Sequence, residues 1–197
     1  MFLDAIIKRA VESGGPRFTQ TTLTLDRASV SMFSGAGTLH GLVLGNPAGY
    51  RTEFAIRVDR TELSVHPGSV LADKLHVRHL RVLAPEINFE GGLAQNNLRQ
   101  ILDNLQAANI TGQASVRSSG AIKKFRVDEF TVTAGRLYVT TALTNSQPLT
   151  VALPDMRFTN LGQGPDGLTS ADLAEQLVGE LYQRTLAAVR QSLGGLS

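Results

Sequence analysis

The chain has no cysteine and no tryptophan, and only three of its 197 residues are tyrosine. Without cysteine it can form no disulfide, no thiolate nucleophile and no cysteine-ligated metal site. So few aromatic side chains also leave few platforms on which single-stranded nucleic acid could stack. The absence of cysteine suits an oxidising and a reducing compartment almost equally, so it does not locate the protein in the cell.

The chain also lacks a long apolar run and an excess of charge. No run approaches the roughly 20 residues that a membrane-spanning helix needs. The 19 basic and 17 acidic residues give a formal net charge of +2, and they form no basic run, so a nucleic-acid surface is not indicated. With 42% hydrophobic residues, residues 1–197 are predicted to fold as a single domain with a sizeable core.

From residue 19 to residue 160 apolar and polar residues mostly alternate, which predicts β-strands. Several segments contain two alternating apolar residues, a polar pair, and then alternation in the opposite phase. The pairs are Asp26-Arg27, Asp59-Arg60, Arg78-His79, Asp128-Glu129 and, less clearly, Pro154-Asp155. A strand presents the same face every second residue, so the apolar face is kept only if each pair absorbs one extra residue. We predict a bulge or bend at each pair and a sheet bent along one line; separate short strands joined by turns are the alternative.

Three segments have the apolar spacing of amphipathic helices. The first, residues 1–15, ends at Gly14, Gly15 and Pro16. It either packs on the core, which is favoured, or is the stub of a membrane anchor or an interfacial helix. The second is residues 96–108, with Asn96 or Asn97 as N-cap. The third is residues 168–193, where Thr169 and Asp172 resemble a capping box. Residues 110–120 are predicted to be a loop, and residues 135–153 a hairpin that turns near Asn145-Ser146.

The predicted fold class is therefore α+β. A long, bent and twisted, mainly antiparallel sheet carries amphipathic N- and C-terminal helices and one internal helix. The helices are expected to cover the apolar side of the sheet.

No residues can be assigned to catalysis, to a cofactor or to a metal. The run SGAGTLHG contains Gly35, Gly37 and Gly41, but no helix follows it as a nucleotide-binding loop requires, so the glycines indicate a strand turn or bend. His76 and His79 would point to opposite faces of a regular strand, unless a bend intervenes, and no acidic spacing supports them as metal ligands. The sequence thus favours a protein that is not an enzyme and has no cofactor.

Three stretches together resemble small bacterial proteins of the AsmA-like type. They are SMFSGAGTLHGLVLGNPAGY, APEINFEGGLAQNNLRQILDNLQ and LPDMRFTNLGQGPDGLTSADLAEQL, and the resemblance covers nearly the whole chain. It implies an N-terminal membrane anchor, absent from the chain as given, and a place at the periplasmic face of the inner membrane. The wider AsmA group is similar to chorein-type bridge proteins, in which a bent sheet forms an apolar gutter for lipid acyl chains. This chain is too short to bridge a periplasm.

Two functions follow as hypotheses. The first is lipid handling or outer-membrane and envelope biogenesis by a membrane-associated protein. The lipid-facing residues, which could equally be plain core, would be Val30, Met32, Leu63, Val65, Val82 and Val132. The second is a structural or accessory subunit of a larger membrane protein complex. The expected partners are a membrane lipid or a protein, not nucleic acid. A sheet whose apolar face is fully sealed by the helices would argue against the first function.

Overall fold

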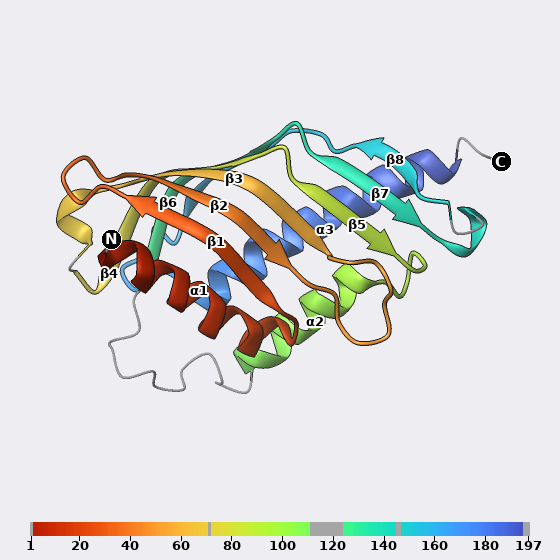
Figure 1. Ribbon diagram of the computed structural model, residues 1–197, viewed down its shortest axis with the longest axis horizontal. Coiled ribbons are helices and arrows are strands. Elements are labelled where there is room, and N and C mark those ends of the chain that lie inside the picture. The colour runs from red at the N-terminus through yellow and green to blue at the C-terminus, as the bar shows by residue number, and fades with distance from the viewer. Residues whose placement is uncertain (1, 71, 111–123, 145–146, 195–197) are drawn as a thin grey trace.

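The computed structural model describes residues 2–70, 72–110, 124–144 and 147–194. Within these ranges a single nine-stranded sheet curls over three α-helices, which lie on its concave side (Figure 1). The predicted α+β class is confirmed. The predicted loop beyond Ile110 and the turn at Asn145-Ser146 lie outside the described residues.

The elements differ from the predicted ranges by only a few residues in most places. In chain order they are α1 (Phe2–Thr19), β1 (Leu23–Val30), β2 (Ala36–Leu44), β3 (Ile56–Val65), η1 (Pro67–Ser69), β4 (Lys74–Leu83), β5 (Glu86–Glu90), α2 (Asn97–Ile110), β6 (Lys124–Thr133), β7 (Arg136–Thr140), η3 (Ala142–Thr144), β8 (Leu149–Ala152), β9 (Met156–Leu161) and α3 (Ser170–Gly194).

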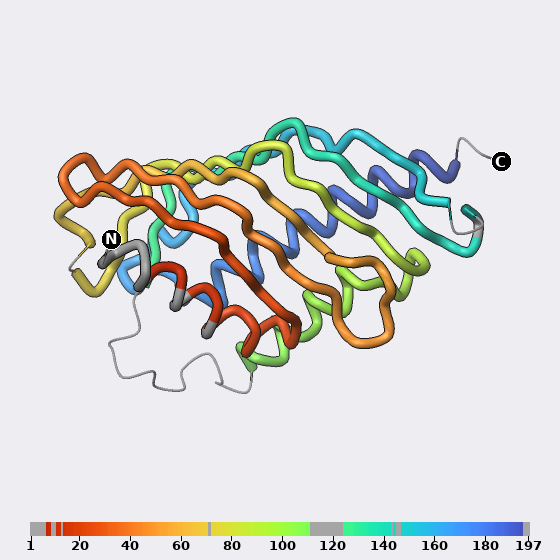
Figure 2. Tube along the Cα trace, viewed as in Figure 1, coloured from red at the N-terminus to blue at the C-terminus, as the bar shows by residue number. Residues whose placement is uncertain are grey.

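The sheet divides into two arms beyond β3. Strands β1, β2 and β3 form an antiparallel meander. The end of β3 pairs with β4 and its start pairs with β5, so that β4, β6 and β9 form one arm and β5, β7 and β8 the other. Two pairings, β4 with β6 and β5 with β7, are parallel, and the others are antiparallel. In Figure 2 each of β4–β5, β6–β7 and β8–β9 follows one long path with a bend in the middle.

The predicted change of phase at the polar pairs is confirmed. In β3, Val58 and Thr61 are three residues apart, yet both are buried, while Asp59 and Arg60 between them are exposed. The same spacing separates buried residues in two other strands: Leu25 and Ala28 in β1, Val127 and Phe130 in β6. A regular strand would turn one member of each couple to solvent. The extra residue therefore keeps the apolar face on the concave side.

The bends lie on two lines, not on the single line that we predicted. The first line is marked by residues that the ladders skip or that directly follow a strand: Asp26, Gly41, Asp59, Ala84 and Ala134. The second crosses β4, β6 and β9 at Arg78, Asp128 and Asn160. Positive φ angles occur on both, for example 47° at Ala84 and 64° at Asn160. Two lines arise because the β3–β4 register places the bend of β3 opposite the end of β4 and not opposite Arg78.

Helix α1 is longer than the predicted 1–15 segment, because Gly14, Gly15 and Pro16 do not end it. A Cβ on Gly15 would lie 2.1 Å from a methyl carbon of Leu23, so the glycine lets α1 approach β1 closely. The helix also covers the edge of β1, where the Glu12 carboxylate accepts the Leu25 N–H at 3.2 Å. Of its predicted apolar face, the side chains of Phe2, Leu3, Ile6 and Ala10 lie outside the described residues, whereas Ile7 and Val11 are half-buried.

A buried amide network ties α2 to the strands. Asn97 is fully buried, and its side-chain oxygen accepts the Glu90 N–H at 3.0 Å. Its amide group donates to the Asn88 carbonyl at 2.8 Å and to the Asn46 side-chain oxygen at 2.7 Å. Asn96, not Asn97, is the N-cap, since its side-chain oxygen accepts the Arg99 N–H at 2.9 Å. Two of the stretches that carry the family resemblance are thus joined by one side chain.

The glycine run lies in the β1–β2 hairpin and in β2, as the sequence predicts. Gly35 has a φ of +71°, and a Cβ there would lie 2.0 Å from the Val65 carbonyl oxygen. We expect Gly35→Ala to lower the free energy of unfolding by about 2 kcal/mol or more, because left-handed strain adds to the displaced β2–β3 contact. Chemical denaturation measures the change. The control is Gly164→Ala, where a Cβ meets nothing within 4 Å; equal losses in both variants would contradict this account of Gly35.

Candidate ligand cavity

An apolar cavity of about 320 Å³ lies between the concave face of the sheet and α3. Its volume is at the lower end of the roughly 300–1,000 Å³ typical of small-molecule sites. Its described lining residues are all apolar except Thr19 and Thr61. The sheet strands β2, β3, β4, β6 and β9 contribute Leu39, Leu42, Leu44, Ile56, Val58, Thr61, Leu80, Val82, Phe130, Val132, Met156 and Phe158.

Helix α3 forms the opposite wall through Ala174, Leu177, Val178 and Leu181. These residues recur at the three- and four-residue spacing that puts side chains on one face of a helix. The start of α3 is fixed by the predicted capping box, confirmed here: the Asp172 N–H donates to the Thr169 hydroxyl at 3.0 Å, and the Asp172 carboxylate accepts the Thr169 N–H at 3.0 Å. The helices therefore cover the sheet but do not fill the space beneath it.

The cavity is not completely enclosed. Leu39 and Leu42 on the sheet and Leu177 and Val178 on α3 are only half-buried, although they line it. A more polar cleft of about 400 Å³ is bounded by α2, α3 and β9. Two residues, Phe158 and Leu177, line both this cleft and the cavity. Within the ranges that the structure describes, the cleft's polar lining residues are Gln106, Glu175, Gln176, Glu180 and Gln183, and no lysine or arginine lines it.

The structure brings together two of the six predicted lipid-facing residues. Val82 and Val132 both line the cavity and are direct partners in the β4–β6 ladder. Val65 is buried in the core, and the partly buried Leu63 packs against the core, but neither residue lines the cavity. Val30 is half-buried at the end of β1, and Met32 is 49% exposed in the β1–β2 hairpin. For these four residues the lipid-facing assignment does not correspond to the cavity.

Most lining residues come from positions that the prediction did not single out. Leu39, Phe130 and Phe158 lie in the same alternating pattern as Val82 and Val132, so the pattern contained them. What it did not contain was the pairing of the strands, which decides whose inward side chains face α3. The lining residues Leu177 and Leu181 belong to the predicted apolar face of the C-terminal helix, which the sequence indicated but could not place over a cavity.

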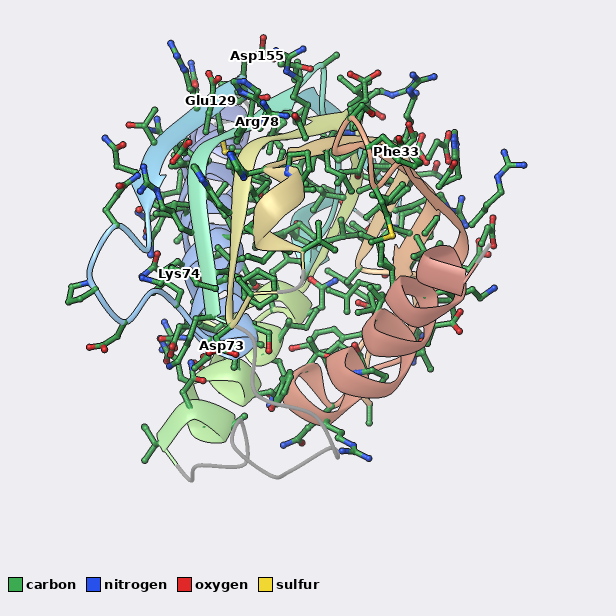
Figure 3. The ribbon with its side chains drawn as sticks, turned by 90° about the vertical axis from the view of Figure 1, so that its left-hand side faces the viewer. Phe33, Asp73, Lys74, Arg78, Glu129 and Asp155 are labelled. Atoms are coloured by element: carbon green, nitrogen blue, oxygen red, sulfur yellow. The ribbon has the colours of Figure 1, made fainter. Side chains whose placement is uncertain are left out.

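The convex face of the sheet is polar and carries ion pairs. Figure 3, which views the molecule from one end, shows Arg78, Glu129 and Asp155 on the outside of the curl. The bend at Arg78 brings both histidines to this outer side: His76 contacts the Asp128 carboxylate at 2.6 Å, and His79 contacts Glu129 at 3.0 Å. This confirms the alternative prediction, that a bend turns both histidines to the same face of the sheet. In the described ranges, no three metal-ligating side chains lie close enough to hold a metal ion.

The charged neighbours of Asp128 predict that the folded protein loses stability in acid. Partial desolvation raises the pKa of Asp128, but hydrogen bonds from His76 and Arg126 and their charges outweigh it, so the folded-state pKa lies below the ordinary 3.8. A lowered folded-state pKa contributes stability above the unfolded value, and this stability is lost as the pH falls through the folded pKa. We expect the difference in the free energy of unfolding between the wild type and Asp128→Asn to become smaller as the pH falls from 5 to about 2. Urea denaturation at each pH measures it, and a constant difference would contradict the assignment.

No family model matches the sequence, and no curated protein matches it either. Among the described helices, none is both long enough and apolar enough to cross a membrane.

Proposed function

We propose that the protein handles lipid without being an enzyme, by holding one acyl chain in the cavity beneath the sheet. The observation that carries the proposal is that α3 covers the concave face and still leaves about 320 Å³ of almost entirely apolar space. A methylene group takes up about the volume of a water molecule, roughly 30 Å³. The cavity therefore suits a chain of about ten carbon atoms, and each methylene moved out of water stabilises the complex by about 0.8 kcal/mol before the cost of ordering the chain.

The surroundings of the cavity favour a ligand whose polar end is uncharged. Among the described residues, no charged side chain lines the cavity itself, and the neighbouring cleft presents Glu175 and Glu180 without a lysine or arginine. A phosphate or carboxylate headgroup in that cleft would meet charges of its own sign. An alcohol or an ester would not.

The proposal extends to the setting of the protein. The resemblance to AsmA-like proteins supports a membrane-associated role in envelope biogenesis at the periplasmic face of the inner membrane. A cavity for a single chain fits a carrier or a lipid-holding subunit better than a continuous bridge, since a bridge needs an open channel along its length.

Native mass spectrometry of the purified protein, followed by solvent extraction, tests the proposal. The expected result is a fraction of molecules that carry one lipid-sized adduct, together with displacement of the fluorescent probe N-phenyl-1-naphthylamine by medium-chain alcohols. Protein without adducts that binds neither the probe nor the alcohols would contradict lipid handling.

A second candidate function is that of an accessory subunit in a membrane protein complex. It is favoured by the tip of the β1–β2 hairpin, where Phe33 is 99% exposed beside the half-exposed Met32 (Figure 3). Large apolar side chains in a contact surface are often anchors for a partner. The test is co-purification at fixed stoichiometry that Phe33→Ser abolishes; unchanged co-purification would exclude the hairpin as the contact.

A further inference from the structure

We propose that Thr61 forms a hydrogen bond with an uncharged oxygen of the ligand, a hydroxyl or an ester carbonyl. This inference rests on the proposed lipid-handling function and names the chemical group that the cavity recognises. It starts from the two polar residues in an otherwise apolar lining, Thr19 and Thr61.

The two threonines differ in how their hydroxyls are satisfied. The Thr19 hydroxyl donates to the Gly15 carbonyl at 3.0 Å and accepts a hydrogen bond from Thr21, also at 3.0 Å. Thr61 is 4% exposed, and its hydroxyl has no hydrogen-bond partner among the described residues. A buried polar group without a partner destabilises a protein by about 1–3 kcal/mol. Such groups are rare in folded proteins and call for an explanation, of which a missing ligand is one.

Thr61 occupies a central position on the concave face. One row of direct strand partners crosses the sheet, each residue paired with the next: Ala28, Leu39, Thr61, Val82, Val132 and Met156. Thr61 is the polar member of this row, and the bend at Asp59-Arg60 turns it inward. Valine has nearly the same shape and an equally high strand propensity. Neither packing nor the strand therefore requires the hydroxyl.

The hydroxyl can serve a ligand without a movement of the backbone. Rotation about χ1 to another staggered rotamer moves the hydroxyl into the position of the methyl group, while the methyl group takes the position of the Cβ hydrogen. A hydroxyl both donates and accepts, so it can bind either a carbonyl or an alcohol. Because no charged side chain from the described part of the chain lines the cavity, an ionised group would be buried there without a counter-charge, which is strongly unfavourable. The ligand class is therefore a medium-length chain with one neutral oxygen.

The test compares Thr61→Val with Thr61→Ser and uses two probes of similar size, octan-1-ol and 1-chlorooctane. Competition against N-phenyl-1-naphthylamine gives both affinities. In Thr61→Val we expect octan-1-ol to bind about five- to tenfold more weakly than in the wild type, with the affinity for 1-chlorooctane unchanged. Thr61→Ser should retain at least half of the wild-type preference for the alcohol.

Several outcomes would overturn the inference. Equal losses for both probes, or no loss for the alcohol, would show that the hydroxyl does not recognise oxygen while leaving the cavity as an acyl site. Wild-type protein that binds neither probe would instead reject the proposed function, and this inference with it. The melting temperature of ligand-free Thr61→Val gives a second reading. A rise supports an unpaired hydroxyl, whereas a fall of several degrees would mean that the hydroxyl is already satisfied.

Discussion

Asn97→Leu is expected to lower the free energy of unfolding by about 3 kcal/mol or more, the largest loss of stability that we predict for a single substitution. The variant places an apolar side chain of similar size at a fully buried position, but it leaves three half-buried partners without Asn97: the Glu90 N–H, the Asn88 carbonyl and the Asn46 side-chain oxygen. Each such group costs about 1–3 kcal/mol when it has no substitute partner. For a protein of this size the loss corresponds to a fall in melting temperature of roughly 10 °C.

Chemical denaturation monitored by circular dichroism measures the change. The control is Gln106→Ala, an exposed amide on the same helix, which should alter the free energy of unfolding by no more than about 0.5 kcal/mol. Asn97→Asp serves as a second variant, since it retains an oxygen for the Glu90 N–H but loses both donated bonds. Asn97→Leu within 1 kcal/mol of the wild type, on the order of one ordinary hydrogen bond, would mean that the network does not hold α2 to the strands.

Ala174→Phe is expected to weaken the binding of octan-1-ol and of N-phenyl-1-naphthylamine at least about tenfold. Ala174 lines the cavity from α3 and is half-buried, so a phenyl ring at this position points into the space that we assign to the acyl chain. Filling an apolar cavity commonly stabilises a protein by about 0.5–2 kcal/mol. The variant should therefore lose binding without losing stability.

Ala187→Phe is the matched control, because it makes the same change on the same helix at an exposed position. It should leave both affinities within about twofold of the wild type, well below the tenfold that 1.4 kcal/mol represents. Fluorescence titration gives the affinities and thermal denaturation the stability. Undiminished binding in a folded Ala174→Phe protein would place the ligand elsewhere.

Much of the fold could be predicted because local patterns determine it. The change of phase at Asp59-Arg60 is visible in the sequence, and it recurs at Asp128-Glu129. The capping box at Thr169 is equally local. Helix α1 was predicted too short because Gly15 and Pro16 usually end a helix. Here the helix continues through both residues, because the close contact with Leu23 and the packing on β1 stabilise it. Tertiary packing of this kind leaves no trace in local periodicity.

The candidate site was less predictable for a related reason. Alternation shows which side chains point inward, but not which strands lie side by side. The two bend lines depend on the β3–β4 register, where the β-bulge at Arg78 shifts the pairing. Only this register makes Thr61 the neighbour of Val82. The missing partner of the Thr61 hydroxyl could not be inferred from the sequence, where threonine in a strand is unremarkable.

In the proposed function an acyl chain occupies the space between the sheet and α3. Photo-crosslinking with a medium-chain alcohol that carries an aliphatic diazirine, followed by mass spectrometric mapping of the insertion sites, tests it most directly. We predict insertion at residues of the two walls, Val132 on the sheet and Leu177 and Val178 on α3, with competition by unlabelled octan-1-ol. Insertion confined to the exposed hairpin tip at Met32 and Phe33, or unaffected by the competitor, would contradict binding of the acyl chain in the cavity.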